Sequence, residues 1–323
     1  MNEEPDESAP EENPPAAPAP DYPAPPADSP PPAAAARPPR NMLPIIAAGV
    51  VVAVLAVAVI GYAAAGIAFA SSRIAGTRTT YNAVVAHQNT ITDEFNAFDN
   101  NLTGVNLTSA TATQLKQSRA AYDTLVSQSR AAQPTIAADD ASLASAQARL
   151  NDNSWLTLFS RSSLNNASAK MGHERKALAA AKAITGDLIQ LGTFYQAFYD
   201  SLIDLDTLST KAQATDFTGA AAAITTLKAD IAKSIQLSSA PGLPPEMKLF
   251  LTDFQTLAVD FGKLLDAAIA GDSNGASADL KAVDADITKI GSYDTDKMSS
   301  EIKAFYQPLI DTFNSEIAKA NKA

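Results

Sequence analysis

The chain after residue 72 carries the pattern of amphipathic helices. Its first stripe alternates spacings of three and four residues, at Tyr81, Val84, Gln88, Ile91, Phe95, Phe98 and Leu102. Such spacing places the side chains on one face of a helix and lies close to a heptad repeat. Residues 103–108 then indicate a turn, so the first predicted helix ends near Leu102.

A second helix is predicted up to about Leu150. Residues that can pack in a helical core recur every seven positions, at Leu115, Tyr122, Ser129, Ile136, Leu143 and Leu150. Either Ser109 or Thr111 is a suitable N-cap for this helix. Pro134 lies within the run, so we expect a kink there or a break just before it.

A third and longest helix is predicted from about residue 163 to residue 211. Its apolar positions are Leu164, Met171, Leu178, Leu188, Leu191, Tyr195, Phe198, Leu202 and Leu205. At the usual rise per residue it would reach roughly 70 Å, a length typical of coiled-coil-like bundles. The apolar run at residues 155–159 is expected to cap the tip of the hairpin between the second and third helices.

Four shorter helices are expected to follow, separated by residues that stop or start helices. Asp216 or Thr218 begins the first of them, and Pro241-Gly242 ends it. Pro244-Pro245 begins the next, Gly271–Gly275 separates it from a third, and Gly291–Asp296 leads to the last. Pro308 is expected to bend the last helix.

The predicted fold class is therefore all-α. Alternating patterns typical of strands are missing after residue 72, and the three-four spacing is typical of helix bundles. We expect residues 73–323 to form an elongated antiparallel helical bundle with coiled-coil-like long helices. A division into sub-bundles 73–213 and 214–323 fits the change in helix length.

A long apolar stretch precedes the bundle and predicts a single transmembrane helix at 43–72. No charged residue occurs from Asn41 to Ser72, and a span needs about 20 apolar residues. The residues that mark this anchor are Leu43, Pro44, Gly49, Gly61, Gly66 and Ala70. The alternatives are a buried helix of a soluble domain and a signal peptide cleaved after Ala70.

The orientation of the predicted span is not decided by charge. Arg37 and Arg40 on one side balance Arg73 and Arg78 on the other. We expect a cytoplasmic N-terminus, with the helical domain exported across the plasma membrane of a bacterial-type envelope. Small residues one turn apart within the span leave open a homodimer through this helix or through the bundle.

Residues 1–42 form the third predicted region, a disordered acidic tail. The first 40 residues hold 14 of the 20 prolines, and their charged residues are eight acids and two arginines. Such a composition buries too little apolar area to offset chain entropy, and it favours polyproline II conformations. The tail would act either as a docking site for partners or as a spacer.

The composition leaves little for catalysis or for nucleic acid binding. The net charge is −11 without a basic cluster, and the chain has no cysteine and two histidines. His173-Glu174 begins like a zinc-protease motif, but Ala177 stands where the second histidine belongs. We therefore expect no enzyme activity, no catalytic residue, no metal and no cofactor, and we expect His173 to lie exposed or at the edge of the bundle.

Two acidic features have a plainer interpretation than a metal site. Asp272 and Asp294 open short acidic loops that lack the EF-hand pattern, so we expect loop acids and helix caps. Asp200, Asp204 and Asp206 cluster on the third helix, where a solvated acidic face is expected rather than paired carboxylates for acid–base work.

Two functions fit these expectations. The first is a single-pass membrane-anchored cell-envelope protein whose helical ectodomain is an interaction or scaffold module, with the lipid bilayer and proteins as partners. The second is an extracytoplasmic sensory or ligand-binding helical module that acts through a partner protein. A ligand pocket between helices would favour the second.

Overall fold

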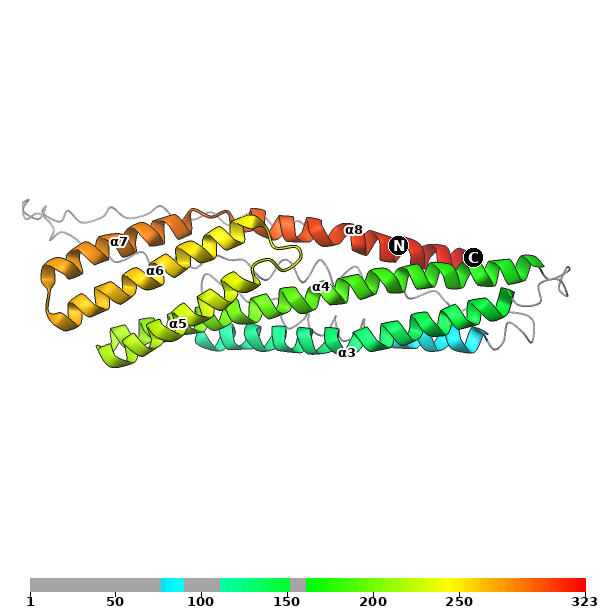
Figure 1. Cartoon of the computed structure of the whole chain (residues 1–323), viewed down its shortest axis with the longest axis horizontal. Coiled ribbons are helices and arrows are strands. Elements are labelled where there is room, and N and C mark those ends of the chain that lie inside the picture. Colours follow the sequence, from blue (N-terminus) through cyan, green and yellow to red (C-terminus); the bar gives the residue numbers. More distant parts are fainter. Residues whose placement is uncertain (1–76, 90–110, 152–160) are drawn as a thin grey trace, which may run out of the picture. The chain divides into compact units, whose positions relative to one another are not determined.

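A computed structural model describes residues 77–89, 111–151 and 161–323, and every regular element in these ranges is a helix (Figure 1). A helix over residues 77–89 comes first. It is followed by α3 (Ala112–Asn151), α4 (Arg161–Gln213), α5 (Phe217–Leu237), α6 (Pro245–Ala270), α7 (Ser273–Gly291) and α8 (Thr295–Lys322). The all-α helical-bundle prediction is confirmed for this part of the chain. The predicted tail at 1–42 and the predicted span at 43–72 lie outside it.

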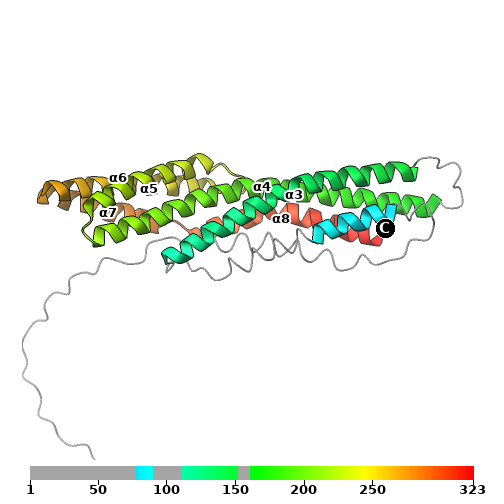
Figure 2. The same ribbon diagram turned by 90° about the horizontal axis from the view of Figure 1, so that it is seen from below.

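Helices α3 and α4 form an antiparallel pair (Figure 2). Arg119 near the start of α3 donates to Asp200 near the end of α4 at 2.9 Å, whereas Asp140 accepts from Arg175 at 2.7 Å. All six heptad positions predicted on α3 are buried, namely Leu115, Tyr122, Ser129, Ile136, Leu143 and Leu150. A seven-residue repeat keeps one face of a helix turned toward its partner, which accounts for their burial.

Helix α4 is the element on which the others assemble. Helix α5 contacts its C-terminal half and α8 contacts its N-terminal half, while α6 packs on α5 and α7 packs on α6. The largest core cluster is aromatic, with the stacked rings of Tyr122 and Tyr195 4.8 Å apart. The boundary predicted near residue 213 stays a prediction, and two helices that follow it, α5 and α8, both contact α4.

The helix starts follow the sequence signals. Thr111 Oγ1 accepts from the amide of Gln114, whose side chain accepts in return from the amide of Thr111, which is a capping box. Asp216, Asp272 and Asp294 cap α5, α7 and α8 with their side chains. The predicted roles of Asp272 and Asp294 as helix caps are thus confirmed.

Pro134 does not break α3. The helix continues through it from Ala112 to Asn151, as α8 continues through Pro308. Proline removes one backbone hydrogen bond and crowds the preceding turn, but Pro134 lies on the exposed side, where water can hydrate the carbonyl left without a partner. The buried positions on either side of it, Ser129 and Ile136, hold the helix against α4.

Candidate functional site

The candidate site is centred on residues 170–182 of α4, here called the junction segment. One of its faces contacts the 77–89 helix, the next contacts α8, and a third lines a groove shared with α3. A helix can serve several neighbours in this way because residues three or four apart share a face, whereas adjacent residues diverge.

The first face holds the 77–89 helix through a buried polar contact. The hydroxyl of Tyr81 donates to Glu174 Oε2 at 3.5 Å, and the Lys170 ammonium lies 4.7 Å from the centre of the Tyr81 ring. Tyr81 is 5% exposed and Glu174 1% exposed. Burial, reinforced by the charge of Glu174, raises the pKa of Tyr81, so its hydroxyl stays a donor at all physiological pH.

Lys170 accompanies this contact at the edge of the core. Burial lowers the pKa of Lys170, while the neighbouring charge of Glu174 opposes the shift. A buried carboxylate is costly unless it is hydrogen-bonded or paired, and the tyrosine hydroxyl and the ammonium meet that need. The arrangement therefore fixes where the 77–89 helix sits on α4.

A second contact ties the same short helix to α3. His87 Nδ1 lies 2.9 Å from Asp139 Oδ1 and 3.2 Å from Oδ2. The His87 side chain is 52% exposed and that of Asp139 8% exposed. The imidazole is therefore the exposed member of this pair, and the carboxylate is the buried one.

The second face of the junction segment meets α8. His173 Nδ1 lies 2.7 Å from Glu316 Oε2, and Lys319 donates to the other carboxylate oxygen of Glu316. Hydrogen bonds from Lys319 and then from His173 lower the pKa of Glu316 to about 2. Beside this contact, Ala177 and Ala180 of α4 pack on Phe313 and Ile317 of α8 in a small apolar cluster.

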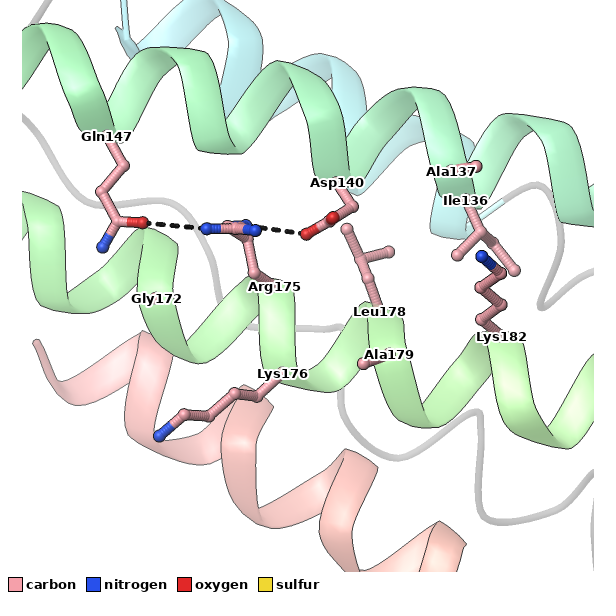
Figure 3. A pocket seen from close by; sticks show the side chains of 10 residues that line it. All are labelled: Ile136, Ala137, Asp140, Gln147, Gly172, Arg175, Lys176, Leu178, Ala179 and Lys182. Atoms are coloured by element: carbon pink, nitrogen blue, oxygen red, sulfur yellow. Dashed lines mark hydrogen bonds and ion pairs between the residues drawn. The ribbon is translucent and has the colours of Figure 1, made fainter.

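The third face opens into a groove of about 680 Å³ between α3 and α4 (Figure 3). Its lining residues are Ile136, Ala137, Asp140 and Gln147 of α3 and Gly172, Arg175, Lys176, Leu178, Ala179 and Lys182 of α4. Ile136 and Leu178 form a buried apolar floor. The groove thus combines small residues, an apolar base and a cationic rim.

The contact between α3 and α4 repeats every seven residues, within the groove and one heptad beyond it. On α3 the row is Gln133, Asp140 and Gln147, and on α4 it is Gly172, Ala179 and Gly186. A Cβ atom at Gly172 would lie 3.3 Å from Gln147 Nε2, and one at Gly186 would lie 3.2 Å from Gln133 Nε2. The two glycines therefore leave room for glutamines of the opposite helix in the same antiparallel register.

The cations of the groove differ in their partners. Arg175 donates from Nε to Asp140 at 2.7 Å and from a terminal nitrogen to Gln147 at 3.4 Å, which holds its guanidinium across the groove (Figure 3). Lys176 and Lys182 form no ion pair within the described ranges. Guanidinium and ammonium groups bind carboxylates and phosphates, so the groove is equipped for an anionic ligand.

Two residues of the predicted acidic cluster on α4 face different helices. Asp200 accepts from Arg119 of α3, whereas Asp204 faces Asp230 of α5. Burial, followed by the charge of Asp230, raises the pKa of Asp204 to about 6. Asp204 is thus one of two carboxylates brought together across a helix contact, which differs from the solvated face that the sequence predicts.

The predicted anchor residues, Leu43, Pro44, Gly49, Gly61, Gly66 and Ala70, lie outside the described residues. Within the described ranges, no helix is both long and apolar enough to cross a membrane. The same ranges contain no group of three or more side chains that could hold a metal ion.

No sequence motif predicted the groove. The pattern in the sequence that corresponds to it is the seven-residue spacing of Gly172 and Ala179 on α4, beside bases at the same spacing, Arg175 and Lys182. Comparison with protein-family models, curated proteins and solved structures finds no match to this chain.

Proposed function

We propose that this chain is a single-pass membrane-anchored protein of the cell envelope whose helical ectodomain binds a partner protein. The apolar stretch at 43–70 is long enough to cross a bilayer and lies only a few residues before the 77–89 helix. In this proposal the N-terminal tail is cytoplasmic and the bundle lies outside the plasma membrane.

The main support for this proposal is the packing of the 77–89 helix against α3 and α4. Its buried apolar side chains, Tyr81 and Val84, belong to the same core cluster as Ile136 and Leu143 of α3 and Met171 of α4. A short helix held by both core packing and the contact of Tyr81 with Glu174 cannot swing freely. A membrane segment joined to it would hold the bundle at a fixed distance from the bilayer, as an interaction module requires.

Fractionation tests the anchoring part of this proposal. The full-length chain should stay with membranes after carbonate extraction, and a variant lacking residues 43–70 should be released. Release of the full-length chain by carbonate would contradict the anchor. An N-terminus at Ser71 in the mature protein would identify the stretch as a cleaved signal instead.

A second candidate function, an extracytoplasmic sensory module, is supported by the junction segment. Residues 173 and 174 contact α8 and the 77–89 helix, while 172 and 175 line the groove. A ligand in the groove would therefore touch the turn that positions the membrane-proximal helix. A ligand-dependent change in the distance between spin labels at Asn82 and Lys303, measured on the full chain in nanodiscs, would support sensing, and a constant distance would argue against it.

A further inference from the structure

The groove runs between the antiparallel helices α3 and α4. The 77–89 helix covers one side of the junction segment and α8 covers the next, whereas no described helix lies over Gly172, Ala179 and Lys182. Grooves between paired helices accept a further helix when small residues line them, because the backbones then approach closely.

The spacing of the groove residues fits a helical occupant. Seven residues advance a helix by about 10.5 Å, or about two turns. Gly172 and Ala179 line the groove seven residues apart, and Arg175 and Lys182 place two positive charges at the same spacing beside them. A third helix with apolar side chains seven residues apart, flanked by acidic ones, would match both rows.

The charge of the groove indicates that the partner helix is acidic. The groove carries three bases, Arg175, Lys176 and Lys182, against the one acid Asp140, although the whole chain has a net charge of −11. A partner with acidic side chains gains from this local reversal of sign. A nucleic acid would require many more cations along its backbone than these three side chains supply.

Arg175 is already oriented for such a contact. Asp140 and Gln147 each accept from one of its nitrogens, so the guanidinium plane is fixed before a ligand arrives and keeps further N–H groups for a carboxylate. Pre-orientation reduces the entropy lost on binding. Lys182, which forms no ion pair with any residue that the structure describes, supplies a second charge one heptad along α4 (Figure 3).

We propose that the α3–α4 groove is the docking site for an acidic amphipathic helix of a partner protein, received across Gly172 and Ala179 and held by Arg175 and Lys182. The proposal rests on the proposed function as an interaction module and names the class of partner. Its test uses purified full-length chain in nanodiscs, so it does not depend on the orientation of the membrane segment.

Three fluorescent peptides of about 20 residues serve as probes. The first is an amphipathic helix with leucines at seven-residue spacing and flanking glutamates, the second replaces every glutamate by lysine, and the third interrupts the acidic helix with two prolines. Anisotropy titrations should show binding of the acidic helix at least about tenfold tighter than binding of either other peptide.

Variants of the chain locate the binding site. The double substitution Arg175→Gln and Lys182→Gln should weaken the acidic helix about tenfold, and Ala179→Leu should weaken it similarly by filling the groove. Lys281→Gln, an exposed lysine of α7, is the matched control and should leave binding unchanged. Circular dichroism confirms that each variant remains folded.

Several results would overturn the proposal. These are equal binding of the acidic and basic peptides, equal binding of the proline-interrupted peptide, absence of binding, or insensitivity to all groove substitutions. Concentration-dependent dimerisation of the chain that is lost in Ala179→Leu would assign the groove to a second copy instead. None of these results changes the outcome of carbonate extraction, so a failure of the groove and a failure of the anchor are distinguishable.

Discussion

The imidazole of His173 and the carboxylate of Glu316 join α4 to α8 across 143 residues of sequence, with Nδ1 and Oε2 2.7 Å apart. Glu316 also accepts from Lys319 in the next turn of α8. The carboxylate therefore has donors on two sides, and the ionised form is the one that the fold stabilises.

Replacing Glu316 by Gln should lower the free energy of unfolding by about 1 kcal/mol near neutral pH, because the charge-assisted bonds are lost. The pKa of Glu316 is lowered from its ordinary 4.5 to about 2, first by Lys319 and then by His173. A lowered carboxyl pKa stabilises the fold above the unfolded-state pKa, and this contribution disappears as the pH falls through that of the folded state.

Urea denaturation at several pH values measures this effect. The difference between the wild type and Glu316→Gln should shrink as the pH falls from 4.5 toward 2. Glu301→Gln, which removes an exposed ion pair with Lys297 on the same helix, is the control and should have little effect. A difference that stays constant with pH would contradict the assignment of Glu316.

Replacing Asp204 by Asn should raise the free energy of unfolding near neutral pH, the opposite of the effect expected for Glu316→Gln. Burial and the facing Asp230 raise the pKa of Asp204 to about 6, so the wild type loses stability as the pH rises from 3.8 through that value. The Oδ2 atom of Asp204 is also buried without a donor in the described part of the chain. Asparagine removes the charge and supplies an amide donor toward Asp230.

Asp204→Asn is therefore expected to stabilise the protein at neutral pH by about 1 kcal/mol, less than the full shift implies because the side chain is partly exposed. In thermal melts, the difference between variant and wild type should be absent below pH 3.8, grow as the pH rises toward 6 and stay constant above it. Asp206→Asn, two residues along α4, serves as the control. A destabilised Asp204→Asn variant at neutral pH would show that Asp204 makes a favourable ionised contact instead.

Alanine substitutions at two glycines of α4 that face α3 should change the stability of the fold by different amounts. A Cβ atom at Gly192 would lie 2.6 Å from Val126 Cγ2, a branched side chain in the core, whereas one at Gly186 meets the flexible end of Gln133. We expect Gly192→Ala to destabilise the fold by about 1–3 kcal/mol through overpacking. Gly186→Ala should be neutral or stabilising by up to about 1 kcal/mol, because alanine favours helix.

Chemical denaturation of the two alanine variants measures the contrast between these positions. Equal effects at 186 and 192 would contradict the close approach of α3 and α4 at Val126. Further substitution of Val126 by Ala in the Gly192→Ala background should restore part of the lost stability, because the added methyl group would then have space.

The attachment of the 77–89 helix to α4 should depend on the hydroxyl group of Tyr81. Tyr81→Phe keeps the ring in the core but removes the donor to Glu174, which is 1% exposed. We expect a loss of about 1 kcal/mol and faster amide exchange confined to residues 77–89. Tyr81→Leu should add the loss of the contact between the Lys170 ammonium and the ring. Unchanged exchange in Tyr81→Phe would show that apolar packing alone holds the helix.

The local features of the fold were predictable because they depend on neighbouring residues. The heptad from Leu115 to Leu150 was confirmed as buried, and Thr111 and Asp216 were confirmed as helix caps. The break considered at Pro134 was not found, because the local cost of proline is small beside the packing of a 40-residue helix on α4. Local rules do not include that packing.

The contacts between distant residues were not predictable in the same way. His173 and His87 have carboxylate partners on other helices, and nothing in the spacing of the chain identifies Glu316 or Asp139 as those partners. The rows that line the groove are visible in the sequence. Which face of α4 remains uncovered depends on where α8 and the 77–89 helix pack, and that is a property of the tertiary structure.

Protease protection in intact cells and spheroplasts tests the central claim most directly. The account predicts that protease added outside removes an epitope at the C-terminus of the bundle, that an epitope in residues 1–40 stays protected until the membrane is opened, and that the protected piece remains with the membrane. Cleavage of the N-terminal epitope while the bundle stays protected would contradict the account, and so would release of the intact chain from the membrane.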